Sequence, residues 1–286
     1  MVKRGQLIDG KAIAEQVKSE LKKEVAELAE KFGKRPGLTV ILVGNDPASE
    51  TYVRGKVRDC EQVGIASELI RLPDTVQEEE LLSEIQRLND DPKTHGILVQ
   101  LPLPEGISPD RVISQIRPDK DVDGFHPLNA GRLATGLDSL LPCTPHGIIQ
   151  MLKRLEIPLA GKHAVVVGRS NIVGKPASFL LQRENATVTM CHSRTKDLAF
   201  HTRQADILIA AVGRLHMITQ DHVKDGAVVI DVGMNRTPTG KLAGDVDFDT
   251  VKQVASYITP VPGGVGPMTR AMLLYNTVQA ARAFFS

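Results

Sequence analysis

Apolar residues at the start of the chain recur with the period of an α-helix. The series follows Asp9, ends before Gly33, and consists of Ile13, Val17, Leu21, Val25 and Leu28. Because residues three or four apart share one face of a helix, this pattern predicts an amphipathic helix. Asp9 is placed to cap its first turn and Gly33 to end it.

Short apolar runs and helical patterns alternate along the rest of the first half. A buried strand is predicted over residues 38–43 and further strands near 69–72 and over 96–101, with helices over 49–63 and 77–88 between them. Strands that alternate with helices are typical of parallel βαβ units with helices on both faces of the sheet. The sequence therefore predicts an α/β fold.

A second alternating series begins near Lys162, after a stretch over residues 102–127 that is rich in Pro and Gly. Its strands are predicted over 164–167, 187–191, 207–211 and 228–232, and a last helix over 269–284. A chain of 286 residues is long enough for two domains. We expect residues 1–145 to form the first domain, completed by the C-terminal helix (269–286), and residues 146–268 to form the second.

Composition excludes several classes of protein. The formal net charge is +1, aromatic residues make up 3% and Trp is absent, so we expect neither a nucleic-acid nor a membrane partner. The longest apolar runs, such as 207–212, are too short to cross a bilayer. Three well-separated Cys residues and isolated His residues indicate no disulfide framework and no metal site. A reducing cytoplasm is the expected compartment.

The segment 164–176 carries the pattern of a dinucleotide turn. An apolar strand leads to Gly168, which allows a tight turn, and Gly174 allows close packing at the start of a helix. Free N–H groups at that helix start would bind a pyrophosphate. The middle glycine of G-x-G-x-x-G is replaced by Ser170 in a loop one residue longer, so an ordinary βα turn is the alternative. Three further strand–helix units favour cofactor binding and a Rossmann domain.

The end of the following strand indicates which nicotinamide cofactor is bound. An NAD site carries an acidic residue about 20 residues after the turn, but residues 191–195 contain no carboxylate. Ser193 and Arg194 are donors, and Arg169 is expected nearby in this fold. Donors and positive charge suit the 2′-phosphate of NADP. We therefore predict that NADP is preferred to NAD.

Polar residues gather on the predicted helix over 49–63. Ser49, Tyr52 and Lys56 are spaced i, i+3, i+7 and share a face, next to a stripe with Val53 and Val57 that is expected to face the core. A row beside the core stripe is where a helix lines a groove, although the same spacing also occurs on solvated helices. Short-chain dehydrogenases have a similar Tyr-x-x-x-Lys motif, but there it follows the dinucleotide turn.

Other polar groups stand where predicted strands and domains end. Gln100 lies at the carboxyl end of a buried strand, the usual place for ligands in such sheets. The acidic turn over 119–127 contains Asp123 and has two other interpretations, a solvated loop or a hydrated-cation site. The segment 260–269 has three glycines before a helix. It would bring backbone against a flat ligand or serve as a hinge between domains.

Taken together, these segments resemble the bifunctional methylenetetrahydrofolate dehydrogenase/methenyltetrahydrofolate cyclohydrolase family over essentially the whole chain. The resemblance rests on six ordered motifs, at 43–56, 100–104, 121–127, 142–145, 168–176 and 260–267. It implies NADP-dependent oxidation of 5,10-methylenetetrahydrofolate to 5,10-methenyltetrahydrofolate, then hydrolysis to 10-formyltetrahydrofolate. It also implies an active-site cleft between the two domains.

The resemblance further implies a role for each matching residue. Lys56 would be the catalytic lysine, Gln100 its orienting partner, and Asp123 the carboxylate that holds the pterin. Tyr52 would stack on the folate ring, and Ser49 would shape the same pocket. The residues implied in binding NADP are Gly168, Arg169, Ser170 and Ser193, with Met234 near the nicotinamide and Gly263 between the two ligands.

We also expect a homodimer. Two alternatives remain open at this point. One is another NADP-dependent dehydrogenase of similar architecture, acting on a hydroxy acid or a shikimate-like substrate. The other is a catalytically silent NADP-binding regulatory module.

Overall fold

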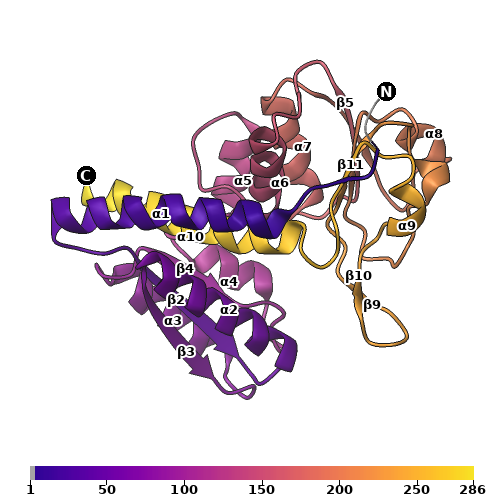
Figure 1. Cartoon of the computed structure of the whole chain (residues 1–286). Helices are drawn as coiled ribbons and strands as arrows, with labels where there is room; N and C mark the ends of the chain where they lie inside the picture. Colours follow the sequence, from indigo (N-terminus) through magenta and orange to yellow (C-terminus); the bar gives the residue numbers. More distant parts are fainter. Residues whose placement is uncertain (1–3) are drawn as a thin grey trace. The chain divides into compact units, whose positions relative to one another are not determined.

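The computed structural model describes residues 4–286 (Figure 1). Within this part of the chain, contacts define two compact units. Unit 1 comprises the residues up to Ala14 together with Thr144–Thr269, and unit 2 comprises Glu15–Cys143 together with Arg270–Ser286. The boundary falls inside the two longest helices, α1 (Gly10–Phe32) and α10 (Val265–Phe285), and at the start of α6 (Cys143–Arg154).

Unit 2 is built on a three-stranded parallel sheet with β2 (Gly37–Val43) at its centre. β3 (Ala66–Leu72) pairs along one edge of β2 and β4 (Gly96–Val99) along the other. All seven residues of β2 are buried. This is the environment that a continuous apolar, β-branched run predicts for a central parallel strand.

Helices connect and cover this sheet. α2 (Pro47–Val63) links β2 to β3: the Asp46 side chain accepts a hydrogen bond from Ser49 N at 2.7 Å, and Gly64 ends the helix with φ +92°. This left-handed conformation costs glycine little. The other helices of the unit are α3 (Glu78–Asp90), α4 (Pro109–Gln115) and α5 (Pro127–Ala134).

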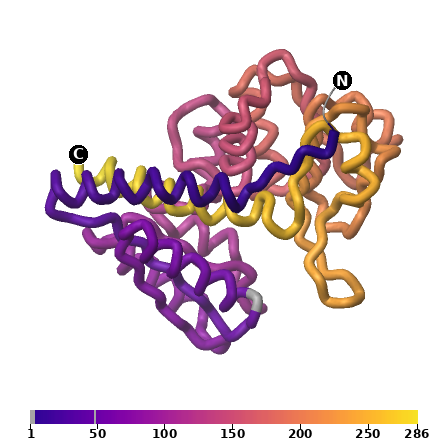
Figure 2. Tube along the Cα trace, viewed as in Figure 1, coloured from indigo at the N-terminus to yellow at the C-terminus, as the bar shows by residue number. Residues whose placement is uncertain are grey.

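The unit 2 parts of α1 and α10 lie side by side, as the indigo and yellow traces in Figure 2 show. Near their distal ends the rings of Phe32 and Phe285 have centroids 5.6 Å apart, and Gln279 donates to Glu24 across 3.2 Å. The predicted apolar stripe of α1 is buried throughout. α10 begins at Val265, earlier than predicted, because Pro267 fits within a first helical turn, where N–H groups lack intrahelical partners.

Unit 1 contains a six-stranded parallel sheet in the order β1-β11-β8-β7-β5-β6. The four strands predicted from the sequence are present as β5 (His163–Val167), β6 (Thr187–Cys191), β7 (Ile207–Ala210) and β8 (Val228–Asp231). Besides α6, which belongs to this unit from Thr144 onward, the helical segments of the unit include α7 (Gly174–Arg183), α8 (Leu198–Thr202), α9 (Phe248–Val251) and a short 3₁₀ helix, Gln220–His222. β9 (Asn235–Arg236) and β10 (Leu242–Ala243) form an antiparallel hairpin.

The N-terminal segment differs from the domain assignment expected from the sequence. β1 (Gln6–Leu7) pairs in parallel with β11 (Tyr257–Ile258), and contacts group the residues up to Ala14 with unit 1, whereas the sequence led us to expect them in the first domain. A strand of two residues has no readable periodicity. Its position is decided by pairing with a strand about 250 residues away in the sequence, which local patterns cannot reveal.

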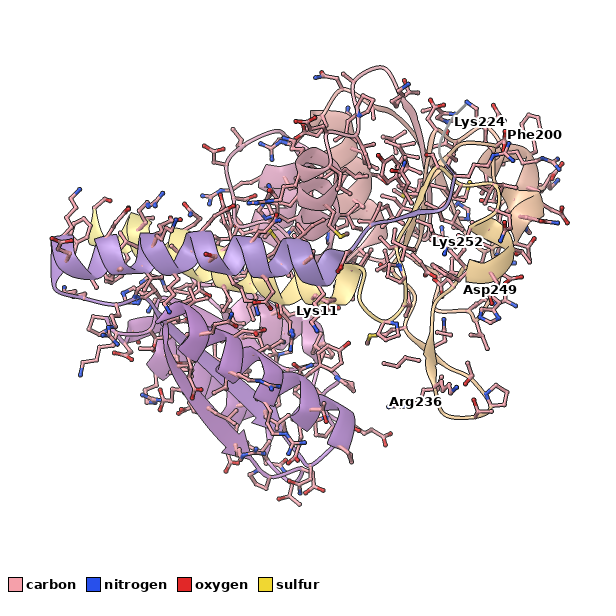
Figure 3. All side chains as sticks on the ribbon, viewed as in Figure 1. Lys11, Phe200, Lys224, Arg236, Asp249 and Lys252 are labelled. Atoms are coloured by element: carbon pink, nitrogen blue, oxygen red, sulfur yellow. The ribbon has the colours of Figure 1, made fainter. Side chains whose placement is uncertain are left out.

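The core of each unit is apolar, and charged side chains such as Lys224 and Asp249 stand at the surface of unit 1 (Figure 3). Among the described residues, no helix combines the length and the hydropathy needed to span a bilayer. Residues 4–286 contain no cluster of three potential metal-binding side chains.

Candidate active site

The polar face predicted for residues 49–63 is present on α2. Ser49 is buried, Lys56 is half-buried, and Tyr52 is 37% exposed. On the neighbouring stripe Val53 lies in the core, as predicted, whereas Val57 is only half-buried. Because α2 follows β2 directly, its first turns stand at the carboxyl end of the unit 2 sheet, where ligands bind in open α/β folds.

Lys56 and Gln100 are in direct contact. Lys56 Nζ donates a hydrogen bond to Gln100 Oε1 at 2.9 Å, and Gln100 Nε2 donates to the Leu101 carbonyl at 2.6 Å. The backbone N–H of Gln100 in turn donates to Ile41 O at 2.9 Å. The contact with Leu101 therefore orients the side-chain amide, so that its oxygen faces the amine of Lys56.

The Asp123 carboxyl lies within electrostatic reach of Lys56. The acidic turn is neither a solvated loop nor a group of metal-binding side chains: Asp121 is buried and Asp123 is partly buried. Burial raises the pKa of the Asp123 carboxyl to about 6, the charge of Lys56 opposes this rise, and Asp121 adds to it. An amine, an amide and a carboxyl of altered acidity thus occupy one region of unit 2.

The turn that carries Asp123 is fixed by a residue that sequence patterns did not reveal. Asn276, buried on α10, donates through Nδ2 to the carbonyl oxygens of Val122 and Leu141, both at 2.8 Å. Cys143 adds a contact from its Sγ to the Val122 carbonyl at 3.2 Å. The signal in the sequence was weak: a single Asn in a predicted apolar helix.

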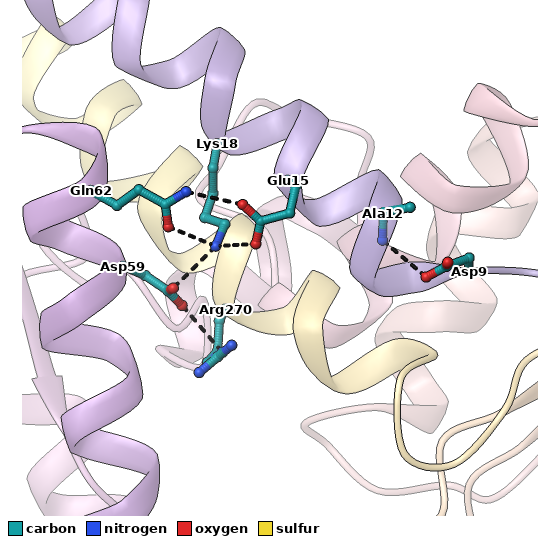
Figure 4. A network of polar contacts seen from close by, with 7 residues as sticks. All are labelled: Asp9, Ala12, Glu15, Lys18, Asp59, Gln62 and Arg270. Atoms are coloured by element: carbon teal, nitrogen blue, oxygen red, sulfur yellow. Dashed lines mark hydrogen bonds and ion pairs between the residues drawn. The ribbon is translucent and has the colours of Figure 1, made fainter.

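A second unpredicted feature is a partly buried ion-pair network that joins α1, α2 and α10 (Figure 4). Lys18 Nζ contacts Glu15 Oε1 at 2.6 Å, Asp59 Oδ1 at 3.2 Å and Gln62 Oε1 at 3.0 Å. Arg270 Nε contacts the other oxygen of Asp59 at 3.2 Å. Asp59 lies one turn after Lys56 on α2, so the network fixes the helix that carries the candidate catalytic lysine.

In unit 1 the predicted dinucleotide turn joins β5 to α7. Gly168 has φ +132°, and a Cβ atom there would lie 2.2 Å from the Ala211 carbonyl oxygen. At Gly174 a Cβ atom would lie 2.2 Å from the Gly168 oxygen. Both positions therefore require glycine, for the turn and for close packing of the helix start, as the sequence indicated.

Ser170 replaces the middle glycine and shapes the turn. Its Oγ accepts hydrogen bonds from the N–H groups of Val173 at 3.2 Å and Gly174 at 3.3 Å. Arg169 is exposed, as is Ser193 beyond the end of β6. The Gly168 N–H donates to Cys191 O at 2.9 Å, so Arg169 and Ser193 follow two adjoining strand ends.

The loops after β7 and β8 meet at Asp245, a residue that no sequence pattern singled out. The fully buried Asp245 carboxylate accepts hydrogen bonds from the N–H groups of Val212, Gly213 and Arg214 at 2.6–3.0 Å, and from Asn235 Nδ2 at 2.9 Å. Met234, 53% exposed, immediately precedes Asn235.

The Asp245 contacts between the loops after β7 and β8 form a clamp, and Asp231 at the end of β8 fixes the backbone around it. Its carboxylate accepts from the N–H groups of Gly233, Asp245 and Val246 at 2.9–3.0 Å. Burial raises the pKa of the Asp231 carboxyl to about 6 despite these hydrogen bonds.

Gly263 belongs to unit 1, as do the other candidate cofactor residues. It has φ +106°, and its carbonyl oxygen accepts a hydrogen bond from Lys11 N at 3.0 Å. A Cβ atom at Gly10 would lie 1.8 Å from the Gly264 oxygen. The glycine-rich tail therefore brings bare backbone against another backbone segment of the same unit.

Fold and candidate residues together define the class: a two-unit α/β enzyme with a Rossmann dinucleotide-binding unit and a parallel-sheet catalytic unit. Comparison with known families agrees. Residues 8–123 match the tetrahydrofolate dehydrogenase/cyclohydrolase catalytic domain, and residues 142–285 match the NAD(P)-binding domain of the same family. The chain belongs to the tetrahydrofolate dehydrogenase/cyclohydrolase family.

Individual relatives cover nearly the whole chain. The bifunctional protein FolD of Brevibacillus brevis is 63% identical over 276 residues, 96% of this chain and 97% of that protein. The crystal structure of the FolD methylenetetrahydrofolate dehydrogenase/cyclohydrolase of Campylobacter jejuni is 52% identical, with a TM-score of 0.95 over 97% of this chain and 99% of that one. The protein is accordingly a methylenetetrahydrofolate dehydrogenase and methenyltetrahydrofolate cyclohydrolase of one-carbon metabolism, and both alternatives from the sequence fall.

Two further solved structures bear on the cofactor. The Trypanosoma brucei enzyme, 41% identical with a TM-score of 0.92 over 97% of each chain, is complexed with NADP and an inhibitor. The Saccharomyces cerevisiae methylenetetrahydrofolate dehydrogenase is NAD-dependent, and it is 25% identical with a TM-score of 0.81 over 98% of each chain. Membership of this fold therefore establishes an NAD(P)-binding domain without deciding between the two cofactors.

Proposed function

We propose that this enzyme uses NADP, and that Lys56, oriented by Gln100, carries the proton transfers of the hydrolytic step. The observation on which the proposal rests is the hydrogen bond of 2.9 Å from Lys56 to Gln100, with Asp123 close enough to be influenced by the lysine charge. Asp123 would hold the pterin, Tyr52 would stack on the folate ring, and Ser49 would help to shape the pocket.

In the first step a hydride passes from the methylene carbon of the folate to the nicotinamide. This transfer requires no proton from the protein, so positioning of the two ligands dominates it. When bound, NADP supplies the hydride acceptor. Gly168, Arg169, Ser170 and Ser193 would hold it, with Met234 and Gly263 beside its reactive end. The hydride leaves a cationic methenyl bridge between N5 and N10 of the folate.

In the second step water adds to the methenyl carbon. As the new C–O bond forms, the water gives one proton to the neutral amine of Lys56. The resulting ammonium donates that proton to N5 as the C–N5 bond breaks, and the remaining hydroxyl proton leaves to solvent as the formyl carbonyl forms. One lysine thus acts as base and then as acid.

The residues that come after β5 and β6 support the preference for NADP. Arg169 and Ser193 are exposed beyond adjoining strand ends, and residues 192–195 offer no carboxylate for a ribose 2′-hydroxyl. A guanidinium and a hydroxyl suit a 2′-phosphate.

Steady-state assays test this proposal directly. Methylenetetrahydrofolate is mixed with the enzyme and either NADP or NAD, and the absorbance of the reduced cofactor and of methenyltetrahydrofolate is followed. We expect the KM for NADP to be at least about tenfold below the KM for NAD, because one charge-assisted contact to the 2′-phosphate contributes about that factor to binding. Equal KM values would contradict the assignment. A homodimer and a cytoplasmic location stay predictions, the first open to analytical ultracentrifugation.

A further inference from the structure

Arg270, the first unit 2 residue of α10, lies against α2 on the face beside Lys56. Its Nε contacts Asp59 Oδ2 at 3.2 Å, while Lys18 holds the other oxygen of the same carboxylate at 3.2 Å (Figure 4). Asp59 is buried, and both of its oxygens are paired with a cation. Asp59 therefore anchors Arg270 through one nitrogen, while Lys18 provides a second positive charge for the same carboxylate.

The guanidinium extends along α2 from Asp59 toward Tyr52. A Cβ atom placed on Gly55 would lie 2.3 Å from Arg270 Nη1, so the absence of a side chain at Gly55 makes room for the group. The charge of Arg270 also acts on Tyr52: burial raises the pKa of the phenol, and the guanidinium opposes that rise. Tyr52, Gly55 and Asp59 are spaced i, i+3, i+7 and share one helical face.

The terminal nitrogens of this guanidinium are available for a ligand. The side chain of Arg270 is 32% exposed, and its ion pair with Asp59 is made by Nε, the nitrogen nearest to the side-chain stem. Lys18 and Asp59 are each only 6–8% exposed, so they are already committed to the network. A planar, partly exposed guanidinium at the edge of an ion-pair network is suited to bidentate binding of a carboxylate.

We propose that Arg270, beside Tyr52, forms an anion subsite that binds a carboxylate of the glutamate tail of the folate substrate. The inference rests on the proposed function, in which the folate ring stacks on Tyr52. A reduced folate continues from its ring system through an aminobenzoyl group to a glutamate that is ionised at neutral pH. Arg270 is then a specificity-determining residue, which distinguishes glutamylated folates from the glutamate-free pteroate.

The test compares 5,10-methenyltetrahydrofolate with 5,10-methenyltetrahydropteroate, which lacks the glutamate, in the hydrolysis assay without NADP. Arg270→Gln should raise the KM for the glutamylated substrate about three- to tenfold, because it removes one charge-assisted contact that is partly exposed to solvent. The effect on kcat should be much smaller. The KM for the pteroate should change far less. Arg270→Lys keeps a positive charge without the fork and should give an intermediate KM.

Arg58→Gln is the matched control, because Arg58 is an exposed arginine on the same helix. It should leave the ratio of the two KM values unchanged. Equal increases for both substrates in Arg270→Gln would overturn the inference and assign Arg270 a purely structural role in holding α2 to α10. Failure of the wild-type enzyme to hydrolyse either substrate would instead overturn the proposed function, so the two failures are distinguishable.

Discussion

Lys56 Nζ donates to Gln100 Oε1 across 2.9 Å, and the amide of Gln100 is itself fixed by its contact with Leu101 O. The two residues lie 44 positions apart in the sequence, on a helix and at the end of a strand. A lysine held in this way is confined in direction yet keeps a proton that it can exchange. Removal of the amine should therefore affect hydrolysis far more than hydride transfer.

Lys56→Met keeps much of the side-chain length and removes the amine. Hydrolysis of methenyltetrahydrofolate should fall at least about a hundredfold, because general acid–base groups contribute about 10²–10⁴-fold. Dehydrogenase activity should stay measurable, since hydride transfer needs no proton from the protein. Both activities are measured by absorbance on the same preparation. Gln100→Ala should give a smaller loss, and Lys22→Met, on an exposed face of α1, should give none. A normal hydrolytic rate in Lys56→Met would refute the assigned role.

The pH dependence of folate use should report Asp123. Burial raises the pKa of its carboxyl from 3.8 to about 6, so the group is ionised at neutral pH and becomes protonated as the pH falls through about 6. The protonated form offers fewer acceptors for the pterin. We expect kcat/KM for methenyltetrahydrofolate to decline below about pH 6, a value that refers to the free enzyme.

Asp123→Asn provides the control for this pH dependence. It should weaken both activities through folate binding and should abolish the acidic decline. Persistence of the same decline in Asp123→Asn would assign it to another group.

Arg169→Ala tests recognition of the 2′-phosphate. The KM for NADP should rise about tenfold or more, because a charge-assisted hydrogen bond contributes about 1.5–3 kcal/mol. The KM for NAD should stay nearly unchanged. Arg203→Ala is the matched control, since Arg203 is an exposed arginine at the end of α8 in the same unit. Equal weakening of both cofactors would show that Arg169 does not read the phosphate.

Asp245→Asn tests the clamp between the loops after β7 and β8. An amide has one acceptor oxygen, so two of the four donors that now face Asp245 would lose their partner, at about 1–3 kcal/mol each when buried. We expect a lower melting temperature together with a higher KM for NADP. Hydrolysis of methenyltetrahydrofolate, assigned to residues of unit 2, should be retained below the melting temperature.

Asp249→Asn is the comparison for that variant, because Asp249 is an exposed carboxylate on α9 (Figure 3). It should change neither the melting temperature nor the KM for NADP. An Asp245→Asn enzyme with normal cofactor binding and only reduced stability would limit Asp245 to a structural role.

The sequence by itself determined the features that depend on neighbouring residues. Helical and strand periodicities place α1, β2, α2 and the strands β5 to β8 to within a few residues. An element that buries one face needs apolar residues at regular spacing, and that spacing is visible in the local sequence. The glycine turn with Gly168 and Gly174 was also predictable from neighbouring residues. Each position tolerates no side chain, and the strand, turn and helix around it are contiguous.

The tertiary structure alone decided what depends on residues far apart in the sequence. Pairing of β1 with β11, the contact of Asn276 with Val122 across 154 positions, and the bond of Arg270 to Asp59 leave no periodic trace. The elevated pKa of Asp123 has the same origin, because it arises from desolvation and from charges that only folding brings near. Local patterns record which face of an element is buried, whereas the identity of its partners is fixed by packing.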